Sequence, residues 1–252
     1  MKMKTNRMLG PGLAGLILLG TFPGNTNAAG LVIVEDNFDR LGPLVGSNAD
    51  SGQTWNGSGP FVTTGTVYQV DGSTTSFASI DGLSFLPSST YCLSVDMTIF
   101  LPISDGWVGL GFKSTGATSV STGTVGTFQM EQTPEVRSHP LNLTLPQIDP
   151  VSAGATSVSH NLEIILQTGA TLASSTLTWE VDNVPVRSSV PVDATGIDGI
   201  FLAHESSASL FRGQFDRLRL LGPIPEPSSA LLLSLAGVGA IVRRRRSVSR
   251  NQ

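Results

Sequence analysis

Apolar and polar residues alternate with the period of a β-strand through most of residues 30–222. In Tyr91–Phe100, four even-numbered positions carry Cys, Ser, Asp and Thr, whereas most odd-numbered ones are apolar. His160–Thr168 likewise places three aliphatic side chains on one face. A period of two residues is typical of strands that bury one face, and we find no comparable helical period between residues 30 and 222.

Turn residues divide this region into short segments, as in antiparallel all-β domains. The expected strands are Leu31–Glu35, Thr63–Val70, Phe77–Ile80, Tyr91–Phe100, Trp107–Lys113, Val125–Glu131, His160–Thr168, Leu177–Val181, Val184–Arg187, Gly199–Glu205 and Gly213–Leu220. The pattern predicts one all-β domain over residues 30–222, built as a single antiparallel β-sandwich.

Three connections stand out between these strands. Asp182-Asn183 separates two of them and predicts a hairpin. Ser114–Gly123 is rich in Ser, Thr and Gly, and we expect a loop there. Thr133–Ala155 contains four prolines and predicts a long irregular excursion, a kind of segment that is either functional or disordered.

The N-terminus has the three parts of a secretory signal peptide. Lys2, Lys4 and Arg7 precede the apolar stretch Leu9–Phe22, and small residues follow it up to Ala28. We therefore expect residues 1–28 to form a signal helix that signal peptidase removes. The apolar stretch is short and leads directly into a cleavage site, which argues against a permanent signal anchor.

The last thirty residues combine a proline motif, an apolar run and a basic end. The apolar run Ala230–Val242 is uncharged and predicts a short transmembrane helix, but a stable span needs about 20 apolar residues. The basic end stays on the cytoplasmic side by the positive-inside rule. The motif residues are Pro225, Glu226 and Pro227, and the basic end is Arg243, Arg244, Arg245 and Arg246. A transient, processed anchor fits this length better than a permanent one, which is the alternative.

Residues 223–252 resemble the PEP-CTERM sorting segment, also catalogued as an "ice-binding protein C-terminal" domain. The resemblance is carried by Pro225-Glu226-Pro227, the apolar run and the arginines, all at the extreme C-terminus. It implies recognition by an exosortase-type membrane protease. It also implies an exported protein that is anchored transiently in the inner membrane and then delivered to the cell surface or the extracellular matrix.

Charge and cysteine content narrow the classes of partner. Residues 30–222 hold 7 of the 15 Lys and Arg and 18 of the 19 Asp and Glu, a formal charge of −11. This excludes a nucleic-acid partner, because phosphate binding needs clustered cations. Cys92 is the only cysteine, so no intrachain disulfide can form. Its place in a strand pattern favours a buried, inert thiol.

The domain also resembles the concanavalin A-like and LamG-like β-sandwiches of secreted proteins. The segments that carry the resemblance are the opening segment Asp36–Gly46 followed by Trp55, the hairpin segment Trp179–Asp182 and the closing strand Gly213–Leu220. Such folds serve lectins, glycan-degrading enzymes and adhesion domains, so the fold alone does not give the function.

The enzymatic signals are weak. Many enzymes of this fold carry two carboxylates in a Glu-x-Asp-x-x-Glu phrase, but Glu180-Val181-Asp182 continues without a second Glu and is better interpreted as part of a hairpin. The histidines have neither a nucleophile-elbow serine nor metal-ligand spacing. We predict no enzymatic activity; the alternative is a secreted, glycoside hydrolase-like enzyme with a non-standard site.

Two binding functions remain as candidates. Sandwiches of this kind often tie their first and last strands with Ca²⁺, a structural cofactor for which Asp36, Asp39 and Asp216 are candidate ligands, with Asp71 and Asp81 as further ones; ordinary surface acids are the alternative. Trp55 follows a turn-rich stretch and is the candidate exposed aromatic for sugar binding. We therefore predict a non-enzymatic binding or structural body that associates with extracellular polysaccharide.

Overall fold

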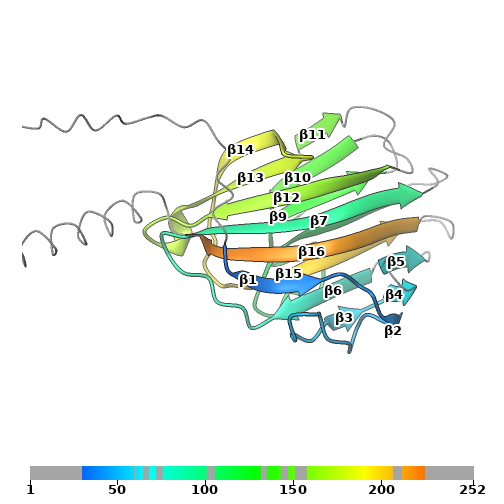
Figure 1. The fold of residues 1–252 in the computed structure, drawn as a ribbon. Coiled ribbons are helices and arrows are strands. Elements are labelled where there is room, and N and C mark those ends of the chain that lie inside the picture. Colours follow the sequence, from blue (N-terminus) through cyan, green and yellow to red (C-terminus); the bar gives the residue numbers. More distant parts are fainter. Residues whose placement is uncertain are drawn as a thin grey trace, which may run out of the picture.

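The computed structural model describes a β-sandwich built from residues 30–59, 61–64, 68–71, 76–100, 106–131, 135–142, 147–150, 158–206 and 212–224. Two antiparallel sheets lie face to face (Figure 1). Among these residues there is no α-helix, and Leu172–Ser174 forms a single turn of 3₁₀-helix. The predicted all-β sandwich is confirmed.

The larger sheet has nine strands. Its order is β14 (Val184–Val192), β13 (Ser175–Val181), β12 (Ser159–Gln167), β7 (Thr90–Phe100), β16 (Arg212–Ile224), β5 (Tyr68–Asp71), β4 (Phe61–Thr64) and β2 (Leu41–Pro43), and β1 (Val32–Asp36) pairs with the second half of β16. The last strand of the domain therefore lies in the interior of the sheet, beside β7.

The smaller sheet has seven strands. Its order is β11 (Gln147–Pro150), β10 (Glu135–Leu141), β9 (Thr124–Glu131), β8 (Gly106–Ser114), β15 (Ile197–Ser206), β6 (Ser76–Asp81) and β3 (Asn56–Ser58). The predicted loop Ser114–Gly123 connects β8 to β9.

The core lies between the sheets because each strand turns its apolar face inward. Leu93 and Val95 of β7 meet Leu110 and Phe112 of β8 in one buried cluster. The residues at even positions of β7 point to the outer face of the nine-stranded sheet, as the alternation predicted. Burial of such apolar side chains is the main favourable term in folding.

The hairpin predicted at Asp182-Asn183 is confirmed. Val181 pairs with Val184, and the two turn residues have φ of 52° and 65°. Positive φ at both central positions defines the type I′ turn, whose twist matches that of the flanking strands.

The expectation of an irregular excursion over Thr133–Ala155 is wrong in part. The structure places β10 and β11 within it, despite Pro140 and Pro150. The sheet tolerates them because β11 is an edge strand and Pro140 lies beyond Glu135–Ser138, the part of β10 that pairs with β11.

The signal segment 1–28 and the sorting residues Pro225–Pro227, Ala230–Val242 and Arg243–Arg246 lie outside the described residues. Within the part of the chain that is described, no helix is long and apolar enough to cross a membrane.

Candidate functional site

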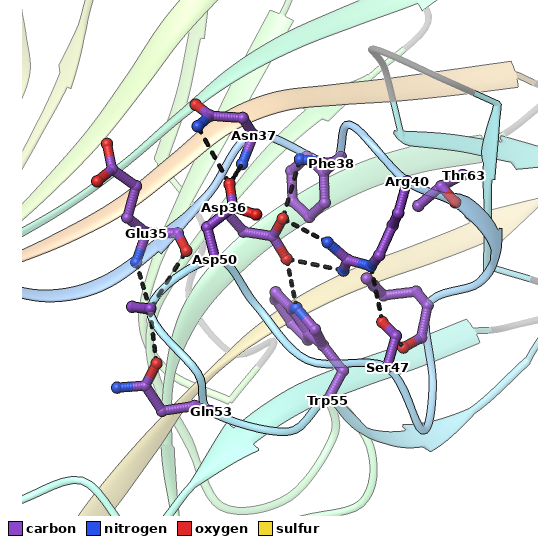
Figure 2. Close-up of polar contacts among 12 residues, drawn as sticks. Glu35, Asp36, Asn37, Phe38, Arg40, Ser47, Asp50, Gln53, Trp55 and Thr63 are labelled. Carbon is purple, nitrogen blue, oxygen red and sulfur yellow. Dashed lines mark hydrogen bonds and ion pairs between the residues drawn. The ribbon is translucent and has the colours of Figure 1, made fainter.

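Asp36, a predicted calcium ligand, lies at the centre of a buried hydrogen-bond network (Figure 2). Its carboxylate accepts two bonds from the Arg40 guanidinium, at 2.7 and 2.8 Å, and one from the backbone N–H of Phe38 at 2.9 Å. The indole Nε1 of Trp55 donates a fourth bond, at 2.7 Å. Both carboxylate oxygens are therefore already occupied by donors of the chain itself.

Trp55 is fully buried, so its predicted role as an exposed sugar-binding aromatic is corrected. Its ring lies 6.3 Å from that of Phe38 and belongs to the main core. A turn-rich flank indicated exposure, but the buried carboxylate of Asp36 provides a partner for the indole N–H inside the protein. Tryptophan is commonly buried where its N–H finds such a partner.

The other two predicted calcium ligands do not join Asp36. Asp39 is exposed, and Asp216 is half-buried on the nine-stranded sheet. The pKa of Asp216 is raised, mainly by burial and also by the charges of Asp96 and Asp39. The backbone N–H and the charge of Arg217 oppose this shift. Among the described residues, no group of three or more His, Cys, Asp or Glu side chains could hold a metal ion. The predicted calcium set therefore does not fit a Ca²⁺ ion, which takes six to eight oxygens.

Glu180 and Asp182, the candidate carboxylates of a glycan-degrading enzyme, have separate surroundings. Glu180 pairs across the strands with Glu163 on the outer face of the nine-stranded sheet, and burial together with Glu163 raises its pKa. Asp182 instead lies 2.7 Å from Nδ1 of the buried His160 and accepts the N–H of Asn161 at 2.8 Å. Asp182 therefore helps to hold the start of β12 to the hairpin turn.

Cys92 lies on the same outer face and is half-buried, where the sequence predicted a buried thiol. Burial raises the pKa of its thiol, and a hydrogen bond and negative charge from Glu163 raise it further, as does the charge of Glu180. A thiol held in its protonated form is a poor nucleophile, in agreement with the predicted inert role.

The described residues form a cleft of about 530 Å³ at one end of the seven-stranded sheet. The strand β3 and the outer face of β6 line one side, and the start of the loop Ser114–Gly123 lines the other. The lining residues are Asn56, Gly57, Ser58, Phe77, Ser79, Asp81, Lys113, Thr115, Gly116, Ala117, Thr118 and Asp198. This volume is within the range of about 300–1,000 Å³ that is typical of small-ligand pockets.

Polar groups converge on Asp81 within this cleft. Asn56 donates its amide N–H to Oδ2 of Asp81 at 3.0 Å, and the Lys113 ammonium forms an ion pair with Oδ1. The Lys113 side chain is 5% exposed and that of Asp81 is 34% exposed. Asn56 and Lys113 thus hold the carboxylate in place while part of it stays exposed to the cleft. It therefore presents a fixed hydrogen-bond acceptor.

Local backbone geometry places these groups. Gly57 has φ of +128°, and a Cβ there would lie 2.0 Å from the carbonyl oxygen of Phe77, so only glycine lets β3 approach β6 this closely. Asp198 sits at a register shift between β15 and β8 and accepts a bond from the Thr115 hydroxyl at 2.7 Å. This bond ties the loop to the floor of the cleft.

Of these groups, the sequence predicts only Asp81, as a further calcium candidate. It does not predict Asn56, Lys113, Thr115 or Asp198. The available signal was the repeated Asp-Gly after or within a strand, at 81–82 and 198–199. Nothing local indicated that Lys113, 32 residues from Asp81, would be its partner.

No family model matches the chain, and no curated protein matches it. Solved structures with the same fold do exist. The Emp47p carbohydrate recognition domain has a TM-score of 0.51 and 10% identity, covering 76% of this chain and 98% of its own. The potassium-bound Emp46p carbohydrate recognition domain has 0.52 and 12%, covering 74% and 97%. The receptor-binding domain of botulinum neurotoxin type G has 0.52 and 8%, covering 79% and 49%. At these identities the likeness shows the fold, and that fold is the concanavalin A-like β-sandwich.

Proposed function

We propose that this chain is an exported, non-enzymatic glycan-binding protein of the cell surface or extracellular matrix, and that its sugar site is the cleft around Asp81. The observation that carries the proposal is the convergence of Asn56, Lys113, Thr115 and Asp198 with Asp81 in one open cleft. Apolar lining with a few fixed polar groups is typical of small-ligand sites.

The chemistry of the cleft suits sugar hydroxyls. A hydroxyl donates one hydrogen bond and accepts others, so it needs a nearby acceptor and donor. The Asp81 carboxylate is the acceptor and the Asn56 amide is a donor beside it, while the buried Lys113 ammonium holds the carboxylate in place. Because these groups hold one another in place, a ligand loses little binding energy to ordering them.

The structural neighbours support a carbohydrate ligand over another class. The two Emp proteins are carbohydrate recognition domains by their names, and each is covered almost completely by the shared fold. Fold likeness alone does not assign the ligand, so the proposal rests on the cleft and takes the neighbours as support.

The export and sorting parts of the proposal rest on the two ends of the sequence. The signal peptide is the substrate of signal peptidase, and the Pro225-Glu226-Pro227 segment with its basic end is the substrate of an exosortase-type protease. These features support a transient inner-membrane anchor, followed by residence at the cell surface or in the matrix with extracellular polysaccharide as partner.

Binding without turnover is the proposed mode of action. The carboxylates that the sequence suggested for hydrolysis, Glu180 and Asp182, are absent from the cleft lining. A screen for hydrolysis of common polysaccharides should show no release of sugar. Turnover that Glu180→Gln abolishes would establish the enzymatic alternative instead.

The test of the glycan site is Asp81→Asn in the full chain, applied to an array of neutral and acidic glycans. Loss of a charged hydrogen-bond acceptor is worth about 1.5–3 kcal/mol, so affinity should fall at least about tenfold. Asp39→Asn, which removes an exposed carboxylate outside the cleft lining, is the matched control and should bind as the wild type does. Equal binding by all three proteins, or by none, would contradict the proposal.

A further inference from the structure

We infer that the cleft receives one end of a neutral glycan chain rather than a segment within a chain. This inference rests on the proposed glycan-binding function and specifies its ligand. It follows from how the loop Ser114–Gly123 lies on the seven-stranded sheet and from the charges that line the cleft.

Next to the cleft, the loop Ser114–Gly123 covers part of the outer face of the seven-stranded sheet. Phe77, Trp107, Phe201 and Ala203 form an apolar cluster separate from the main core, and Val120 of the loop belongs to it. Their sequence neighbours, such as Ala78 and Leu202, belong to the main core, so the cluster lies on the opposite, outer face. Every member is at most 8% exposed. A glycan cannot stack on these aromatic rings while Val120 is in place.

The loop is fixed in this position by hydrogen bonds at both ends. The Ser114 backbone N–H and hydroxyl both bind the carbonyl of Gly123, at 2.7 and 2.8 Å. The Thr124 hydroxyl binds the carbonyl of Val120 at 2.9 Å, and Thr115 binds Asp198. These bonds fix the loop as one side of the cleft.

The wall closes the path along the sheet. Thr115, Gly116, Ala117 and Thr118 line the cleft, and Val120 of the same loop packs in the cluster with Phe77, which also lines the cleft. A chain that enters beside Asp81 therefore meets the loop and has no exposed aromatic surface beyond it on β8 or β15. For a chain that runs along the sheet toward the loop, the cleft accommodates an end, because an internal segment would need an exit in that direction.

The charges favour a neutral sugar. Two carboxylates, Asp81 and Asp198, face one ammonium group, Lys113, and that group is buried and already paired with Asp81. A uronate or sulfate ester would meet like charge without a free cation to receive it. Like-charge contact is the usual means by which a site rejects a wrong ligand.

The test measures competition by a polysaccharide before and after partial hydrolysis. The full chain is bound to immobilised neutral glycans, and soluble glucan, mannan, galactan and polygalacturonate compete. If the cleft binds chain ends, the mass concentration of competing polysaccharide that halves binding should fall in proportion to the increase in chain ends. Polygalacturonate should not compete at either stage. An unchanged mass concentration, or competition by the acidic polymer, would overturn the inference.

A variant in the loop provides a second test. Val120→Ser weakens the contact with Trp107 and Phe201 and should let intact, uncleaved polysaccharide compete better than it does with the wild type. A folded variant with unchanged competition would mean that the loop does not exclude internal segments. If Val120→Ser does not fold, the hydrolysis series on the wild type decides alone. Failure of the proposed function looks different, because no polysaccharide would then bind and Asp81→Asn would match the wild type.

Discussion

Asp36 is the residue on which the opening segment of the domain depends. Three residues donate four hydrogen bonds to its buried carboxylate, and one of these residues, Trp55, lies 19 positions away. A buried carboxylate is stable only when it is paired and hydrogen-bonded in this way. The hydrogen bonds between Asp36 and Arg40 therefore hold the opening segment of this domain in its fold.

Trp55→Phe should destabilise the protein without affecting glycan binding. The ring is largely retained, but the carboxylate of Asp36 loses one donor in a buried site, which costs about 1–3 kcal/mol of unfolding free energy. Urea denaturation measures this loss. Trp179→Phe is the control, since its indole N–H bonds only a neutral carbonyl, that of Gly126, at 3.3 Å. An equal loss in both variants, or reduced glycan binding by the Trp55 variant, would contradict the structural role.

At the scale of elements, the strands that alternate strictly were the predictable ones. β7 and β13 lie where alternation predicts strands, because each buries one face against the core, although β13 begins at Ser175, two residues before the predicted start. β10 and β11 were not predictable, since their prolines are tolerated only through their positions in the sheet. The cleft could not be predicted for a similar reason. Asn56, Asp81 and Lys113 lie on three separate strands, and only the folded sheet brings their side chains together.

The cross-strand pair Glu163 and Glu180 should make stability depend on pH. Burial and the charge of Glu163 raise the pKa of Glu180 in the folded state, so the folded protein binds this proton more tightly than the unfolded chain. Stability therefore falls as pH rises through the ordinary range of a glutamate carboxyl and up to the raised pKa. Glu180→Gln removes this penalty and should melt at a higher temperature than the wild type near neutral pH.

The gain should vanish at about pH 3, where the Glu180 carboxyl is protonated in both the folded and the unfolded chain. Thermal melts of the two proteins across this range measure the difference. Glu205→Gln, which changes an exposed glutamate of the other sheet, is the control. A gain for Glu180→Gln that is the same at acidic and neutral pH would mean that the pair does not repel.

We expect both ends of the molecule to be removed during export. The mature protein from its native host should lack residues 1–28 and the segment after about Pro225–Pro227, because the N-terminus has the pattern of a signal peptide and the C-terminus resembles a sorting segment. Intact mass measured after cell fractionation tests both cleavages together. Recovery of the Arg243–Arg246 end in the membrane fraction would indicate a simple anchor instead.

The position of β16 also sets the order in which the domain can fold. This strand is made last but fills the space between β7 and β5, and it pairs with β1 from the opposite end of the sequence (Figure 1). Until Arg212–Ile224 is available, the edge of β7 that faces away from β12 has no partner, and the two parts of the nine-stranded sheet cannot join. Contacts between such distant segments form slowly. A chain that crosses a membrane from its N-terminus would therefore be threaded through unfolded, and its sandwich would assemble only on the far side, after the last strand has emerged.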